Sequence, residues 1–181
     1  MIMSNKRRVY VSIHHRDELS LGDNRVRLGY EAFHWGILIT PKTSSGPDSL
    51  AFDVSDGAVP DPISRQDTNP YRNWMFRVKT QVDPIRSGRL IGRVLIGKVP
   101  NNITDFQIQS VLATVSLPVK DTTPQQSCVT WTMAAVVALQ NAGLARKFDI
   151  SQFIAWALSY ADYWLASPNA YNSYDYAVGS Q

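Results

Sequence analysis

The sequence has one cysteine, three histidines and no long apolar run, and each shortage excludes a class of protein. A single cysteine cannot form an internal disulfide, which agrees with a reducing compartment. No cysteine and histidine lie at zinc-finger spacing, so we expect neither a structural metal nor another cofactor. The longest apolar run, around Ala134 to Leu139, is far shorter than a bilayer requires. We therefore expect no membrane span.

An excess of charge of one sign is also lacking. The formal net charge is only +3, and lysine and arginine are scattered after the short cluster Lys6-Arg7-Arg8. A nucleic-acid interface needs a larger basic face, so we interpret the cluster as a solvated tail before a strand and exclude nucleic acid as a partner. No apolar stretch of signal-peptide length follows it, which makes the cytoplasm the expected location.

The composition that remains is that of one globular domain. The chain has 181 residues, of which 44% are hydrophobic and 18% charged. This length suffices for one core and is short for two. We therefore predict a single domain over residues 1–181, with residues 1–8 and 167–181 as flexible ends.

The first part of the chain favours strands. Alternation of Val9, Val11 and Ile13 with polar residues predicts a strand. Proline, glycine and serine between two apolar runs predict an antiparallel hairpin over residues 31–55. The polar segments 16–29 and 56–74 are expected to be loops. The predicted strands cover residues 7–15, 30–40, 49–55, 74–82 and 89–99.

The second part of the chain favours helices. Apolar residues recur at helical spacing over 103–115, with Thr104 as a plausible cap. A second helix is predicted to start at Cys128 and to stop at Gly143. A third is predicted to run from Asp149 to Ala166, with Asp149 or Ser151 as its cap. Strands followed by helices predict an α+β fold, in which a mainly antiparallel sheet packs against helices.

Cys128 is predicted to be the first residue of its helix. Pro124 fits only before a helix or in its first turn, and Ser127 is a good N-cap. Unpaired backbone N–H groups and the helix dipole at that position favour a thiolate over a thiol. A free cysteine is also a common small core residue, so the position alone leaves both interpretations open.

The predicted hairpin supplies two partners for the thiol. His34 begins the strand HWGILIT, and a neutral imidazole can take a thiol proton near pH 7. Hairpin pairing places Asp53 near the residue opposite His34, in an apolar strand where a carboxylate needs a partner. We expect Cys128 within hydrogen-bonding reach of His34, and Asp53 near the other ring nitrogen, as in a triad.

Four further residues are candidates for binding a substrate. Trp35 and Trp131 flank the proposed pair and Tyr30 lies near the start of the hairpin, so they are predicted to wall an apolar pocket. Large aromatic residues at such spacing also serve as core. Gln126, just ahead of the cysteine, is a candidate oxyanion donor together with the cysteine backbone N–H. Its neighbour Gln125 is an alternative, and both are typical loop residues.

The strand HWGILI, the hairpin strand AFDVS and the SC-x-x-W helix together resemble the circularly permuted papain-like thiol enzymes, which include the lecithin-retinol acyltransferase-like proteins. In the permuted order the histidine strand precedes the cysteine helix, as here. A closer likeness is to fungal proteins with an HW strand, a strand like LIGKV and a C-x-x-W helix that ends in glycine. The resemblance spans roughly residues 9–145.

This resemblance implies a permuted papain-like fold with Cys128 as nucleophile, His34 as base and Asp53 as the orienting residue. Two positions depart from the relatives. Position 127 is serine where they often have asparagine, and position 53 is aspartate where the acyltransferase branch often has histidine. These departures leave the class of substrate open.

Three functions follow from these residues. The favoured one is a thiol-dependent hydrolase or acyltransferase acting on an amide, ester or thioester of a small molecule or peptide. The second is a cyclase or isomerase of secondary-metabolite biosynthesis that uses His34 and Asp53 for non-covalent proton transfer. The third is a binding protein whose Cys128 only packs, with the last helix and the tyrosine-rich tail serving self-association into a homodimer.

Overall fold

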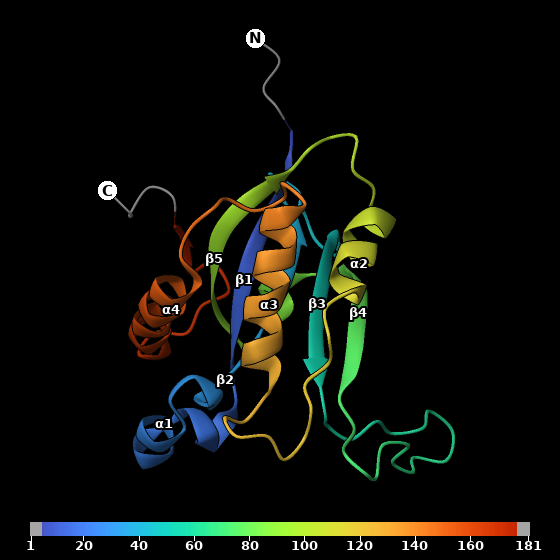
Figure 1. Cartoon of the computed structure of the whole chain (residues 1–181), viewed down its shortest axis with the longest axis vertical. Coiled ribbons are helices and arrows are strands. Elements are labelled where there is room, and N and C mark those ends of the chain that lie inside the picture. The colour runs from blue at the N-terminus through green and yellow to red at the C-terminus, as the bar shows by residue number, and fades with distance from the viewer. Residues whose placement is uncertain (1–4, 177–181) are drawn as a thin grey trace.

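The computed structural model describes residues 5–176, which form an α+β fold with one six-stranded mixed sheet (Figure 1). The strand order is β4-β3-β2-β1-β5-β6. Neighbouring strands are antiparallel except β5 and β6, which are parallel. The strands are β1 (Arg7–His15), β2 (Phe33–Thr40), β3 (Ser49–Ser55), β4 (Met75–Val82), β5 (Leu90–Val99) and β6 (Ser173–Asp175).

The first five strands confirm the predicted strands, and β6 is the addition that makes the sheet mixed. Its three residues, SYD, are too few to produce a hydrophobic period. The expected flexible ends are therefore partly in the sheet. Residues 7–8 belong to β1 and residues 173–175 to β6, whereas residues 1–4 and 177–181 lie outside the described residues.

The helices are α1 (Gly22–Leu28), α2 (Asp105–Ala113), α3 (Cys128–Asn141) and α4 (Ile150–Leu165). The last three confirm the predicted helices and their caps. The side chains of Thr104, Ser127 and Asp149 each accept a hydrogen bond from a backbone N–H of the first turn. Gly143 follows α3 with φ of 72°, a conformation that favours glycine and ends the helix.

The prediction of a loop over residues 16–29 was wrong, because this segment contains α1 and a short 3-10 turn, Asp17–Ser20, and a second such turn, Gly29–Ala32, begins at its last residue. The helix has no buried residue and no side-chain cap, so it carries no apolar stripe that a sequence pattern would reveal. Tertiary contacts hold it instead. Arg25 forms a bidentate ion pair with Asp162 of α4 at 2.6 Å and lies over the Phe33 ring.

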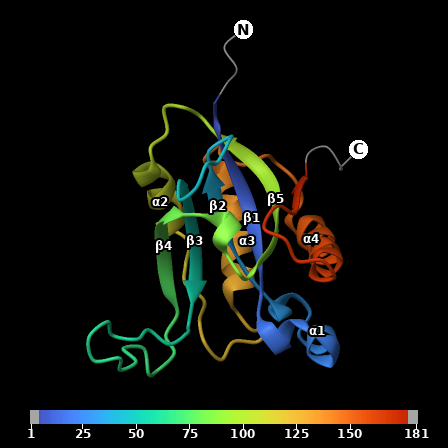
Figure 2. The ribbon, with the colours of Figure 1, turned by 180° about the vertical axis from the view of Figure 1, so that it is seen from behind.

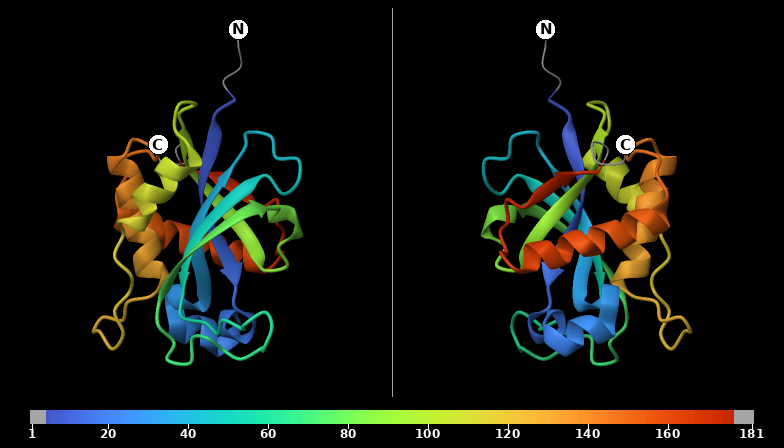
Figure 3. Two further views of the ribbon diagram at one scale, coloured as in Figure 1. Left: turned by 90° about the vertical axis from the view of Figure 1, so that its right-hand side faces the viewer. Right: turned by 90° about the vertical axis from the view of Figure 1, so that its left-hand side faces the viewer.

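The helix α3 covers one face of the sheet and packs on β2 and β3 (Figure 1). Figure 3 shows α2 on the same side of the sheet as α3. The connection between β4 and β5 crosses the opposite face (Figure 2). Side chains under α3 are apolar and form the main core, for example Val9, Val11, Ile13, Trp35, Ile37, Phe52 and Val54. None of the helices in residues 5–176 combines the length and apolar character needed to cross a membrane.

Candidate functional site

Four elements bring titratable side chains to one end of the sheet. His14 stands at the end of β1, His34 at the start of β2 and Asp53 near the end of β3. Cys128 begins α3, whose first turn lies at that same end (Figure 1). The antiparallel order of the three strands therefore collects residues that are far apart in the sequence.

The strand register places these polar residues on one face of the sheet. His14 pairs with His34, and Ser12 pairs with Gly36. A Cβ atom on Gly36 would lie 2.9 Å from the Phe52 carbonyl oxygen and 3.2 Å from the Asp53 Cβ. The glycine thus lets β3 approach β2 closely, beside the place where Asp53 reaches His34.

Asp53 is only 6% exposed and lies at the centre of an ionic cluster. One carboxylate oxygen lies 3.1 Å from His34 Nε2. Arg77 donates from Nε at 2.6 Å and from Nη2 at 2.9 Å, and Lys79 donates from Nζ at 3.0 Å. Burial alone would raise the pKa of Asp53, but hydrogen bonds from His34 and Arg77 and the charges of Arg77 and Lys79 hold it far below its usual range. The carboxylate is therefore ionised.

His34 interacts with both of its predicted partners. Burial opposes its protonation, but hydrogen bonds with Asp53 and Cys128, and the charges of both, raise the pKa of His34 to about 9. The ring is therefore an imidazolium at neutral pH. This cation contacts both the Asp53 carboxylate and the Cys128 side chain.

His14 is a second histidine in the same group, with its ring centroid 6.0 Å from that of His34. Its Nε2 lies 3.1 Å from the Ser12 hydroxyl. Burial and the positive charges of His34, Lys79 and Arg77 lower the pKa of His14 to about 3, against the attraction of Asp53. His14 is therefore neutral, and only one of the two rings carries charge.

The first turn of α3 fixes the position of Cys128, whose side chain is buried. The Ser127 hydroxyl accepts the N–H of Val129 at 3.0 Å and donates to the Glu31 carboxylate at 2.5 Å. The Thr130 hydroxyl accepts the N–H of Ser127 at 2.8 Å, which completes a capping box. Cys128 thus lies on a rigid helix start rather than on a loop.

These side chains line a cavity of about 850 Å³, which is of the size that binds small molecules. His34, Asp53 and Cys128 all contribute to its wall. The β4–β5 connection borders it through Pro84 and Arg89. The three residues predicted as a triad therefore meet one another at a space that a substrate can occupy.

A second hollow of about 570 Å³ lies beside the first, between α1, α3 and α4. The two share Leu28, Glu31 and Gln125 as lining residues. Tyr30, one of the predicted binding residues, lines this second hollow. Glu31 stands between the two spaces, where it holds the Ser127 cap.

The other predicted binding residues lie away from the cavity wall. Trp35 is fully buried in the core and donates its ring N–H to the Tyr30 carbonyl at 2.9 Å. Trp131 is 2% exposed and packs against Phe76. Gln126 accepts the N–H of Val119 at 2.9 Å, whereas its neighbour Gln125 is among the described residues that line both spaces.

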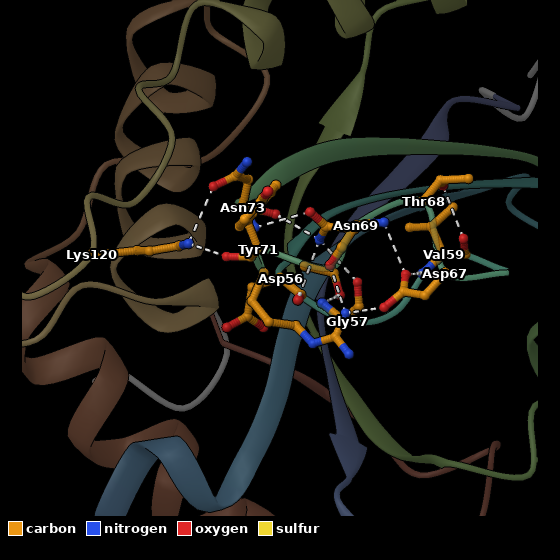
Figure 4. A network of polar contacts seen from close by, with 11 residues as sticks. Asp56, Gly57, Val59, Asp67, Thr68, Asn69, Tyr71, Asn73 and Lys120 are labelled. Carbon is orange, nitrogen blue, oxygen red and sulfur yellow. Dashed lines mark hydrogen bonds and ion pairs between the residues drawn. The ribbon is translucent and has the colours of Figure 1, made fainter.

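A polar network holds the loop 56–74 (Figure 4), and two of its residues, Asp56 and Gly57, line the cavity. Asn69 is 6% exposed and donates to the carbonyls of Gly57 and Asn73, both at 3.0 Å. Lys120, in the segment that leads to Cys128, donates to the Tyr71 carbonyl and to Asn73 Oδ1. The network therefore joins the two loops that approach the site from β3 and α3.

Sequence reasoning missed Arg77, Lys79 and Glu31. Arg77 and Lys79 are two residues apart in β4, so their side chains lie on the same face of the sheet. The sequence alone indicates this. It does not indicate their pairing with Asp53 and Ala51, because a 19-residue loop leaves the register of β3 and β4 undetermined. Glu31 has no local pattern at all.

No group of three or more histidine, cysteine, aspartate or glutamate side chains within residues 5–176 could hold a metal ion. The chain matches no curated protein and no solved structure. Residues 6–164 match the model of a family described as "Family of unknown function (DUF6914)". Because this match covers most of the sequence, the chain belongs to that family.

Proposed function

We propose that the protein is a thiol-dependent hydrolase or acyltransferase of the circularly permuted papain-like kind. The observation that carries the proposal is the chain of contacts from Cys128 through His34 to Asp53 on the wall of one cavity. The element order supports it as well, because the histidine strand β2 precedes the cysteine helix α3. Substrates are amides, esters or thioesters of a small molecule or peptide.

The proposed reaction begins from the imidazolium–thiolate pair. The Cys128 sulfur attacks the carbonyl carbon, a C–S bond forms and the carbonyl electrons move to oxygen. As the tetrahedral intermediate collapses, the bond to the leaving nitrogen, oxygen or sulfur breaks and His34 gives that atom its proton. Water or another acceptor then gives a proton to His34 and attacks the thioester, which releases the acyl group and the Cys128 thiolate.

We assign two donors to the oxyanion that forms in this reaction. The backbone N–H of Cys128 lies at the start of α3, where N–H groups lack partners within the helix. Gln125 lines the cavity just ahead of it. Gln125 therefore replaces Gln126 as the side-chain amide that we assign to the oxyanion.

The non-covalent alternative is less well supported by the contacts of Asp53. Arg77 and Lys79 already occupy both of its carboxylate oxygens, and its pKa is held far below the usual range. Such a carboxylate is a poor base for proton transfer. Its contacts suit an orienting role toward His34.

Alkylation of the single cysteine by iodoacetamide tests the proposed pair without a known substrate. An ordinary thiol, with a pKa of about 8.5, gains roughly 75-fold in rate between pH 6 and pH 8. We expect the native protein to gain less than about threefold, because the thiolate is already present at pH 6. His34→Ala should restore the steep dependence. His15→Ala, at the rim of the same cavity, is the matched control and should keep the flat profile.

Turnover of a panel of amides, esters and thioesters is the second test of the proposed function. Cys128→Ala and His34→Ala should each lower kcat by at least about a thousandfold, and the double variant should lose little more, since the two groups act as one unit. A native protein that labels as steeply as an ordinary thiol, or that resists the reagent at both pH values, contradicts the proposal. Full activity in Cys128→Ala would favour the non-covalent alternative.

A further inference from the structure

Positive charge exceeds negative charge around Asp53. Arg77 alone satisfies this carboxylate by a two-pronged contact at 2.6 and 2.9 Å, yet Lys79 and His34 also lie at 3.0 and 3.1 Å. A single carboxylate does not require three cationic partners. The second cation, Lys79, is therefore the feature that an orienting role for Asp53 leaves unexplained.

The surplus is local to Asp53. Elsewhere on the cavity wall Arg89 pairs with Asp17 at 3.0 Å, and Arg16 lies with Glu31 and Asp56 among the lining residues. Within the described residues, Arg77 and Lys79 share Asp53 as their one anionic partner.

The two cations also have unused hydrogen-bond donors. Within the described residues, Arg77 Nη1 has no acceptor, and Lys79 gives one hydrogen bond, to Asp53. Their side chains are 38% and 47% exposed, and both line the cavity. A ligand in the cavity can therefore reach a guanidinium edge and an ammonium group together.

We propose that Arg77 and Lys79 bind a carboxylate of the substrate, so that the substrate is an acid derivative with a free carboxylate a few bonds from the reacting carbonyl. The planar guanidinium edge and the ammonium group suit a carboxylate because both give charge-assisted hydrogen bonds. The short separation follows from the contacts. His34 touches both Cys128 and Asp53, and the two cations touch Asp53. The role of the reacting carbonyl rests on the proposed function, whereas the carboxylate site is testable separately.

Two alkylating reagents, one negatively charged and one uncharged, test the carboxylate site. Iodoacetate carries a carboxylate and iodoacetamide does not, and both attack the same sulfur of the only cysteine. The ratio of their rates at one pH therefore cancels the fraction of thiolate. We expect this ratio to be at least fivefold higher in the native protein than in the urea-denatured chain, and to fall when salt screens the cations.

Variants then test which residues raise the ratio of the iodoacetate rate to the iodoacetamide rate. Lys79→Gln should lower it severalfold while Arg77 still holds Asp53, and Lys79→Arg should retain most of it. Lys98→Gln is the matched control, because Lys98 is an exposed strand lysine outside the cavity wall and its loss changes the net charge equally. An unchanged ratio in Lys79→Gln, with iodoacetamide labelling intact, overturns the inference and leaves the proposed function standing.

A thiol that resists both reagents in the native protein contradicts the proposed function and moves the test to binding. Succinate and its uncharged diamide are then compared at equal ionic strength by thermal unfolding, since a ligand bound only to the folded state raises Tm. A rise with succinate that exceeds the diamide effect and disappears in Lys79→Gln supports the carboxylate site. Equal effects of the two compounds, or a succinate effect retained in Lys79→Gln, overturn it.

Discussion

The two faces of the sheet use the same strands for different purposes. Under α3, β1 and β2 present apolar side chains such as Ile13 and Trp35, all fully buried. On the opposite face the intervening positions of the same strands present Ser12, His14 and His34. Because side chains alternate along a strand, one hydrophobic pattern both builds the core and leaves every second position free for chemistry.

The difference predicts that substitutions on the helix-covered face act on stability and those on the cavity face act on reactivity. His34 and Trp35 are adjacent in sequence and lie on opposite faces, so they give a direct comparison. The two faces meet at the end of the sheet, because α3, which covers the apolar face, brings Cys128 into contact with His34 of the cavity face.

Trp35→Ala is expected to have the largest effect on stability. The side chain is fully buried and its ring N–H bonds the Tyr30 carbonyl, so its removal leaves a large cavity and an unpaired group. We expect a loss of about 4 kcal/mol in the free energy of unfolding, measured in urea. His34→Ala, the neighbour on the other face, should cost only about 1 kcal/mol. Equal losses in the two variants would contradict the division between the faces.

Asp53→Asn tests a residue of the cavity face that we also expect to contribute to the free energy of unfolding. The change leaves Arg77 and Lys79 without their anion, and both are more than a third exposed, so solvent limits the loss to about 2 kcal/mol. A folded-state pKa below the usual value means that the stabilisation is present above pH 4 and is lost as the pH falls. The difference between wild type and variant should therefore shrink in acid.

The matched control for that change is Asp56→Asn, since Asp56 is an exposed aspartate on the same cavity wall. It should change the free energy of unfolding by less than about 0.5 kcal/mol. A difference between wild type and Asp53→Asn that stays constant from pH 7 down to pH 3 would show that the ionic cluster does not stabilise the fold.

Local patterns predicted the elements well and their assembly less well. The strands and the caps Thr104, Ser127 and Asp149 follow from short stretches of sequence and were found. The position of Cys128 at a helix start follows from the same rule. The helix α1 was missed because its stability comes from contacts with Phe33 and Asp162, which no local pattern records.

The candidate site divides in the same way. His34 and Asp53 belong to one short hairpin, so their nearness was predictable from a turn and a register. Arg77 and Lys79 reach Asp53 across a long loop, and the pairing that brings them there is a property of the folded sheet. The sequence therefore did not predict the positive charge around Asp53, although it did indicate the residues of the proposed triad.

The smallest expected effect is that of a substitution at Gly36, where β3 approaches β2 closely. In Gly36→Ala the new methyl group would lie 2.9 Å from the Phe52 carbonyl oxygen, a backbone atom that can move only with β3. We expect a cost of about 1 kcal/mol in unfolding free energy, because overpacking forces a small shift of the strand. That shift also separates His34 from Asp53, so iodoacetamide labelling of Cys128 at pH 6 should slow severalfold. Gly88→Ala is the matched control at the same cavity, since nothing lies within 4 Å of a Cβ there. If both alanine variants label and unfold alike, the close approach of β3 to β2 at Gly36 is not what holds the histidine in place.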